Sequence, residues 1–360
     1  MTPSTAGLRA SIRLERSEFT IDAALEVPPG STAALLGPNG AGKSSVLAAI
    51  AGLVDVGGGS ALSIELDGRV LDDTTRNIWI PPEHRRLGMV FQEHRLFGHM
   101  SVLENVAFGP RSAGARAADA RRTALHWLGL LGVDGLSTRR PNQLSGGEAQ
   151  RVAIARSLAT QPDILLLDEP LAALDVTTRS EIRRVLRNQL HSFVGPRLLV
   201  THDPSDAFLL ADRLFVIEAG HITQAGTPDE IRRAPATSYV AALTGTNLYL
   251  GSAHDGVVDL ADHDHRLTIT DHAVTGAVLV SVHPTAVSLH PARPSGSHRN
   301  SWDATVQIVE PLGDTVRVTL GGPIPIAVDV TPEAVSSLGL HPGSNVWAAV
   351  KATEITATPA

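Results

Sequence analysis

The chain has 360 residues and 43% of them are hydrophobic, which supports one to three domains with large buried cores. It contains no cysteine, so disulfides, thiolate metal sites and a cysteine nucleophile are excluded. The formal net charge of -7 argues against a broad nucleic-acid-binding surface, and we expect no nucleic acid partner. The longest apolar runs are far below the roughly 18–20 residues that span a bilayer, and no signal segment is visible, so we expect a cytoplasmic protein.

Up to residue 235, short apolar runs alternate with helical patterns. Continuous apolar runs that end in polar residues lie at 32–37, 164–169 and 197–202, and helical spacing lies at 44–53 and 148–159. Such runs are typical of parallel strands that are buried on both faces and carry functional groups at their C-terminal ends. We therefore predict an α/β domain over residues 1–235, with a mostly parallel sheet and a helical insertion over approximately 93–160.

The remaining chain, residues 236–360, changes character. Short Val- and Thr-rich segments alternate between apolar and polar positions and are separated by Gly, Pro, Asp and His, which predicts antiparallel strands. A weak internal repeat relates residues 276–291 to 343–359. We therefore expect an all-β regulatory domain in which two halves, 245–291 and 297–357, build one small barrel of the OB type.

The first chemical motif is "GPNGAGKS", which fits G-x-x-x-x-G-K-[ST] between a predicted strand and a predicted helix. Its backbone N–H groups can wrap phosphate oxygens, and the helix N-terminus adds a favourable dipole. The Lys43 ammonium can reach the terminal phosphates, and the Ser44 hydroxyl can ligate Mg²⁺. The predicted nucleotide contacts in this loop are Gly37, Pro38, Asn39, Gly40, Ala41, Gly42, Lys43, Ser44 and Ser45.

Polar side chains at other predicted strand ends complete the candidate site. In "ILLLDEP", Asp168 can hold Mg²⁺, and Glu169 can orient and polarise the attacking water. His202 ends "LLVTH" and can contact the γ-phosphate, and Gln92 can reach the metal or the water. The sequence therefore predicts ATP and Mg²⁺ as cofactors.

The stretch "LSGGEAQRVAIARSL" contains a second predicted anion site, which has no lysine. Ser145, Gly146 and Gly147 offer a hydroxyl and backbone N–H groups at the start of a helix. One phosphate loop already covers one side of a triphosphate, so the second site is useful when it comes from another copy of the chain. We predict that two chains close face to face around two nucleotides.

In this order and spacing, the motifs resemble the nucleotide-binding subunit of an ABC transporter over about residues 8–235. The resemblance implies a P-loop ATPase that acts as a homodimer on the inner face of the cell membrane. It also implies transmembrane permease subunits that contact the ATPase near Gln92.

The resemblance assigns roles to individual residues. It implies that Glu169 is the catalytic base, that His202 is the switch residue, and that Asp175 lies in the dimer-facing loop. The predicted catalytic set is Glu169, His202, Lys43 and Gln92, and the predicted metal set is Ser44, Gln92 and Asp168. Family members usually stack adenine on a Tyr or Trp before the phosphate loop, whereas the nearby aromatic here is Phe19.

A second resemblance concerns the substrate. The segments "DGRVLDD" and "IPPEHRRLGMVFQEHRLFGHMSVLENVAFG" resemble the ATPase of molybdate importers. The segments "SHRN", "EPLGDTVRVTL" and "VTPEAVSSLGLHPGSNVWAAVKAT" resemble a small β module that binds molybdate or tungstate. The resemblance implies an oxyanion held by Ser297, Arg299, Lys351 and Thr353, since an oxyanion requires charged and hydroxyl donors. It also implies an extracytoplasmic oxyanion-binding protein as a partner.

Several alternatives remain open. Importer ATPases for sulfate, ferric iron, a polyamine or a sugar also carry β tails, and the tail can equally be a dimerising barrel with an empty site. Non-transport ABC ATPases of DNA repair or translation typically have two ATPase halves or long coiled coils, and basic surfaces, which this sequence lacks. A pure oxyanion-binding regulator is disfavoured by the intact Asp168–Glu169 pair and by His202.

Overall fold

The computed structural model describes residues 7–15, 19–57, 59–172, 174–295 and 299–360. The chain divides into two compact units, Met1–Pro228 and Asp229–Ala360. The boundary expected at residue 235 therefore lies within the second unit. Within the described ranges, no helix combines the length and the apolar character that crossing a membrane requires.

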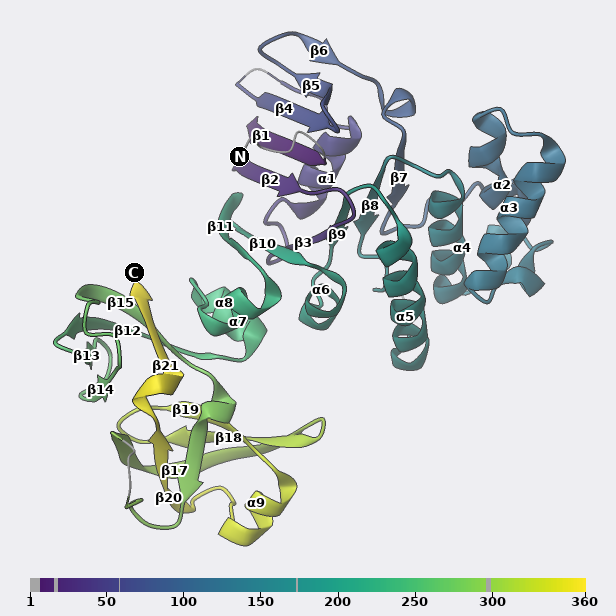
Figure 1. The fold of residues 1–360 in the computed structure, drawn as a ribbon. Helices are drawn as coiled ribbons and strands as arrows, with labels where there is room; N and C mark the ends of the chain where they lie inside the picture. Colours follow the sequence, from purple (N-terminus) through teal and green to yellow (C-terminus); the bar gives the residue numbers. More distant parts are fainter. Residues whose placement is uncertain (1–6, 16–18, 58, 173, 296–298) are drawn as a thin grey trace. The chain divides into compact units, whose positions relative to one another are not determined.

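The first unit is built on one mixed eleven-stranded sheet, in the order β6-β5-β4-β1-β2-β11-β10-β3-β9-β8-β7 (Figure 1). The strands are β1 (Leu8–Glu15), β2 (Thr20–Val27), β3 (Thr32–Leu36), β4 (Ala61–Leu66), β5 (Arg69–Asp73), β6 (Ile78–Trp79), β7 (Leu87–Val90), β8 (Ile164–Asp168), β9 (Arg197–Val200), β10 (Arg213–Glu218) and β11 (His221–Gly226).

Parallel pairing joins β10, β3, β9, β8 and β7, and links β2 to β11. Every residue of β3, β8 and β9 is buried, as expected for strands covered on both faces. The pairings among β1, β2, β4, β5 and β6 are antiparallel. In β1 and β2, buried and exposed positions alternate, which is the signature of strands with one covered face.

Helices pack against this sheet and beside it. They are α1 (Lys43–Ala51), α2 (Val102–Ser112), α3 (Ala117–Leu130), α4 (Gly146–Ala159), α5 (Val176–Ser192) and α6 (Pro204–Leu210). In Figure 1, α2 and α3 lie beyond α4, and α4 in turn packs against β7. These three helices occupy the segment for which the sequence predicted a helical insertion.

The buried Arg85 side chain fixes the far end of α1. Its guanidinium forms a 2.7 Å ion pair with Asp72 and donates to the backbone oxygens of Ile80 and Ile50, at 2.6 and 2.9 Å. The exposed fractions of the two charged side chains are only 0% and 4%, so each charge depends on the other for compensation. Arg85 therefore ties the helix that follows the phosphate loop to β5.

The second unit contains two five-stranded antiparallel sheets, β14-β13-β12-β15-β21 and β16-β20-β17-β18-β19. Its helices are α7 (Pro228–Arg233), which starts at the boundary, α8 (Ser238–Thr244) and α9 (Pro332–Leu338). The strands are β12 (Asn247–His254), β13 (Val257–Leu260), β14 (Arg266–Thr268), β15 (Gly276–Val282), β16 (Val287–His290), β17 (Asn300–Leu312), β18 (Thr315–Gly321), β19 (Ile326–Val330), β20 (Asn345–Val350) and β21 (Ile355–Pro359).

The two halves of this unit exchange strands. The repeat seen in the sequence forms β15–η4–β16 in the first half and β20–η5–β21 in the second, where η4 (Pro284–Ala286) and η5 (Ala352–Glu354) are single 3₁₀ turns. β21 pairs with β15 and β16 pairs with β20, so each sheet takes an edge strand from the other half. Apolar side chains of both sheets form one continuous core.

We expect Arg85→Leu to lower the free energy of unfolding by about 3–5 kcal/mol, because the Asp72 carboxylate then stays buried without a partner. Equilibrium denaturation in urea, followed by circular dichroism, measures this change. The double variant Arg85→Leu/Asp72→Asn is the control, and it should recover part of the lost stability because it removes the stranded charge. Equal stability of Arg85→Leu and the unsubstituted chain would contradict this account.

Candidate active site

The phosphate loop connects β3 to α1, and its glycines are required by geometry. A Cβ at Gly37 would lie 2.2 Å from the backbone oxygen of Ile217. Gly40 and Gly42 have φ angles of 81° and 102°, which side chains with a Cβ rarely adopt. Gly42 is the N-cap of α1, so the loop ends with free N–H groups at a helix start, which suits phosphate binding.

The Lys43 side chain is folded into this loop. Its ammonium donates to the carbonyl oxygens of Gly37 and Pro38, at 2.8 and 2.9 Å. Burial lowers the pKa of Lys43, while the nearby carboxylates of Glu169 and Asp168 act in the opposite direction. The loop therefore holds a buried cation beside two acids.

Asp168 ends β8 and faces the start of α1. Its Oδ1 accepts a 3.4 Å hydrogen bond from the Ser44 hydroxyl. Burial raises the pKa of Asp168, the Ser44 hydrogen bond opposes that shift, Glu169 adds to it, and Lys43 opposes it. A carboxylate next to a hydroxyl is the hard oxygen pair that Mg²⁺ prefers, so these two residues fit the predicted ion.

Glu169 lies between two partners from neighbouring strand ends. Its Oε2 accepts a 3.3 Å hydrogen bond from Gln92 Nε2, and its Oε1 lies 3.1 Å from His202 Nδ1. The backbone of Glu169 is left-handed, with φ of 47°, and its N–H donates to Val200 at 2.9 Å. Strained backbone of this kind persists where surrounding contacts enforce it and is often found at functional sites.

Phe19 lies beside the phosphate loop, directly before β2. Its ring edge would be 3.7 Å from a Cβ placed on Gly42, and the exposed fraction of the residue is 38%. A large aromatic ring is thus available to a flat ligand next to the loop.

Ser145 and Asp175 begin two helices. The Ser145 hydroxyl accepts from the Glu148 N–H at 3.3 Å, and the Glu148 carboxylate accepts from the Ser145 N–H at 2.7 Å, which completes a capping box at the start of α4. Asp175 accepts from the Thr178 N–H at 3.0 Å at the start of α5. Ser145 and Gly146 are exposed, so the start of α4 is open to a ligand.

Two residues that position parts of the candidate site, Glu148 and Arg156, were missed by our sequence reasoning. Glu148 has a visible signal, because Ser-x-x-Glu before an apolar helix is the pattern of a capping box. Arg156 has none: it donates to the backbone oxygens of Arg95 and His94, at 2.7 and 3.0 Å. This contact joins α4 to the segment that follows Gln92.

The oxyanion residues predicted in the second unit are only partly described. Lys351 and Thr353 line a cavity of about 700 Å³. Arg299 is exposed and directly precedes Asn300, which pairs with Val350, so Arg299 and Lys351 lie at the same end of the β17–β20 ladder. Ser297 lies outside the described residues.

The family model described as ABC transporter matches residues 21–172, and the TOBE domain model matches residues 296–357. The molybdenum import ATP-binding protein ModC of Mycobacterium tuberculosis is 40% identical to this chain over 98% of both chains. The chain therefore belongs to the ABC transporter ATP-binding proteins, and it is an ATP-binding and ATP-hydrolysing importer subunit with a TOBE domain.

Other relatives carry different substrate names. The sulfate/thiosulfate import protein CysA of Bacillus cereus is 36% identical over 93% of this chain and 92% of its own. The Fe(3+) ions import protein FbpC 1 of Rhizobium meliloti is 35% identical over 82% and 81%. The solved dimeric cassette MJ0796, bound to ADP and Pi, matches 61% of this chain and 98% of its own, with a TM-score of 0.53 and 28% identity.

We expect Gly37→Ala to weaken ATP binding at least about tenfold, because the added Cβ would displace the loop from the Ile217 carbonyl. Equilibrium dialysis with a non-hydrolysable ATP analogue measures the affinity. The control is Gly135→Ala, where a Cβ meets no atom within 4 Å. An unchanged affinity in Gly37→Ala would show that the loop can shift without consequence.

Proposed function

We propose that this ATPase energises the import of molybdate through separate permease subunits. The observation that carries the substrate assignment is the 40% identity to a molybdenum import protein over nearly the whole of both chains. The cavity that contains Lys351 and Thr353 supports it, because an ammonium and a hydroxyl suit an oxyanion. The relatives named for sulfate and ferric iron define the alternatives.

The proposed mechanism starts from residues that already touch one another. Lys43 and the loop N–H groups bind the β- and γ-phosphates, and Ser44 and Asp168 would hold Mg²⁺, which supplies charge stabilisation at the phosphates. Glu169, held between Gln92 and His202, orients water for in-line attack on the γ-phosphate and accepts its proton. Phe19 stacks against the adenine.

We propose that the site is completed by a second copy of the chain. Ser145, Gly146 and Gly147 present an exposed helix start with a free hydroxyl proton and N–H groups, which suits the γ-phosphate of the partner's nucleotide. Asp175 lies in the loop that faces the partner. The dimeric state of the solved cassette MJ0796 is consistent with this arrangement.

We further propose that the subunit is peripheral on the inner face of the cell membrane. The permease subunits would contact the segment that begins at Gln92. This residue donates a hydrogen bond to Glu169, so a displacement of the segment would change the position of the Glu169 carboxylate. An extracytoplasmic oxyanion-binding protein would deliver the substrate to the permease.

Glu169→Gln tests the base. We expect ATP hydrolysis to fall at least about a hundredfold, since proton acceptance is lost, while ATP binding persists and a closed dimer accumulates. Phosphate release, ATP titration and light scattering measure these three properties. The control is Glu181→Gln, which removes an exposed carboxylate on α5. Full ATP turnover in Glu169→Gln would show that Glu169 is not the catalytic base.

Isothermal titration tests which oxyanion the protein binds. Isothermal titration of the full-length Glu169→Gln chain, saturated with ATP so that its phosphate site is filled, should show heat with molybdate and tungstate and less with sulfate. Lys351→Met should weaken this binding about tenfold through the loss of a charged donor. Arg293→Met is the control because it removes the same charge beside Trp347, outside the cavity. Absence of molybdate heat would contradict the molybdate assignment and leave the ATPase intact.

A further inference from the structure

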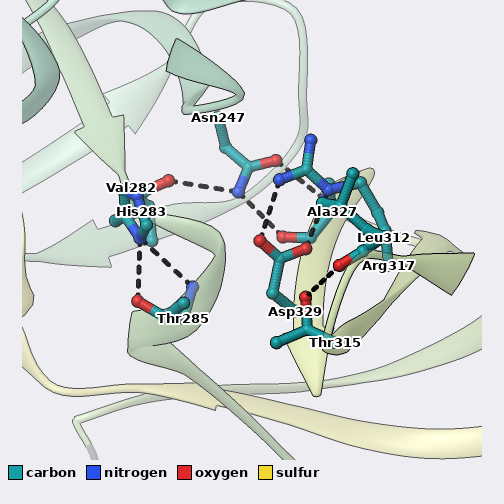
Figure 2. Close-up of polar contacts among 9 residues, drawn as sticks. All are labelled: Asn247, Val282, His283, Thr285, Leu312, Thr315, Arg317, Ala327 and Asp329. Carbon is teal, nitrogen blue, oxygen red and sulfur yellow. Dashed lines mark hydrogen bonds and ion pairs between the residues drawn. The ribbon is translucent and has the colours of Figure 1, made fainter. Parts of the chain in front are cut away.

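The two halves of the second unit are related residue by residue. Asn247, at the start of β12, pairs with Val282, and its side chain donates to the Val282 and Ala327 oxygens and accepts from the Ala327 N–H (Figure 2). Asn300, at the start of β17, pairs with Val350 and bonds in the same way to Val350 and Thr268. Asn247 thus joins the end of the β12–β15 pair to β19, and Asn300 joins the end of the β17–β20 pair to β14.

The same relation extends to the 3₁₀ turns. His283 follows Val282 and is the N-cap of η4, and Lys351 follows Val350 and is the N-cap of η5. Two positions later come Thr285 and Thr353. His283 is therefore the internal counterpart of Lys351, and Thr285 is the counterpart of Thr353.

Both turns open onto the same cavity of about 700 Å³. His283 and Thr285 of the first turn and Lys351 and Thr353 of the second all line it, because β15 pairs with β21 and β16 pairs with β20. Ser288 and Thr356, also counterparts, extend the hydroxyl lining. The cavity is therefore lined by two equivalent sets of donors that face a common space.

Helix α7 adds further charge to this cavity. Arg232 and Arg233 line it together with Asp229, and Glu354 of η5 also lines it. The Ser281 hydroxyl donates to the Arg233 backbone oxygen at 3.0 Å, which fixes the end of α7 against β15. Arg232 forms a 3.8 Å ion pair with Asp229. Three cationic side chains and two carboxylates therefore line the cavity before His283 is counted, and this balance favours an anion.

The surroundings of His283 restrain its protonation in the free protein. Burial lowers the pKa of His283, and the cations of Arg232 and Arg317 lower it further, whereas Asp329 acts in the opposite direction. Arg317 binds Asp329 through two 2.8 Å hydrogen bonds, which leaves this carboxylate largely compensated (Figure 2). Lys351, Arg233, Asp229 and Glu354 are the other charged groups of the cavity.

A hydrogen bond also selects the form of the imidazole. The Thr285 N–H donates to His283 Nδ1 at 3.4 Å, and the Thr285 hydroxyl lies 2.8 Å from the same nitrogen (Figure 2). Nδ1 is thus an acceptor, which leaves the neutral ring with a proton on Nε2. A second proton would bind Nδ1, where it displaces the contact from the Thr285 N–H, so its charge requires compensation by an anion.

We propose that this cavity is a single binding site for a doubly charged oxyanion, with Lys351–Thr353 and His283–Thr285 as its two sides, and that the anion binds together with a proton on His283. This deepens the proposed function, on which it rests, by adding a pH-sensitive side to the oxyanion site. A bound dianion raises the pKa of His283. The affinity for the anion is therefore highest below the pKa of His283 in the free protein, and it falls as the pH rises toward the raised pKa of the bound state.

Substitution by the counterpart residue tests the proposal. The full-length Glu169→Gln chain, saturated with ATP, is titrated with molybdate at about pH 6 and about pH 8, in two buffers with different heats of ionisation. We expect about tenfold tighter binding at the lower pH, with uptake of a proton. His283→Lys should bind tightly at both pH values without proton uptake, and His283→Gln should bind weakly at both.

The control is His341→Gln, an exposed histidine outside the cavity, which should retain the pH dependence. The inference is overturned if Lys351→Met loses molybdate binding while His283→Gln and His283→Lys bind as the Glu169→Gln parent does. Thermal melting checks that all variants fold. If the parent gives no heat with molybdate, tungstate or sulfate, the oxyanion part of the proposed function and this site both fail. These two results are distinct.

Discussion

The buried charge of Lys43 is the constraint around which the first unit is arranged. An ammonium removed from water needs oxygen partners, and the loop supplies two carbonyls only because it curls through glycines at positions where a Cβ would clash or be strained. Asp168 and Glu169 compensate the remaining charge. The same burial disfavours the charged form of Asp168, so a divalent cation and a triphosphate would together relieve both groups.

Strand order explains why the other site residues meet. β7, β8 and β9 are adjacent and parallel, so Gln92, Glu169 and His202, which follow their C-terminal ends, converge at one edge of the sheet. β3 adjoins β9 and contributes the phosphate loop to the same edge. The site is thus a consequence of parallel pairing, and the left-handed backbone of Glu169 turns its carboxylate between its two neighbours.

The sequence predicts several strands and most site residues of the first unit, but it does not predict contacts that depend on how distant segments pair. Continuous apolar runs predicted β3, β8 and β9, and the motifs predicted the residues at their ends, because each signal is local. The antiparallel strands β4 and β5 were not predicted, because continuous apolar runs were the criterion and buried and exposed residues alternate in β4. The contacts of Arg85 and Arg156 were inaccessible, because both donate mainly to backbone oxygens and therefore leave no pattern of side-chain types.

In the second unit, too, the pairing between distant segments was not visible in the sequence. The internal repeat was visible in the sequence, and two halves were expected to build one barrel. The sequence did not show that each half completes the sheet of the other. That exchange brings η4 and η5 together and makes His283 a neighbour of Lys351's site. The cavity also includes α7, which begins where the first unit ends. The cavity thus depends on strand exchange and on α7 together, and no local sequence pattern shows that these segments meet.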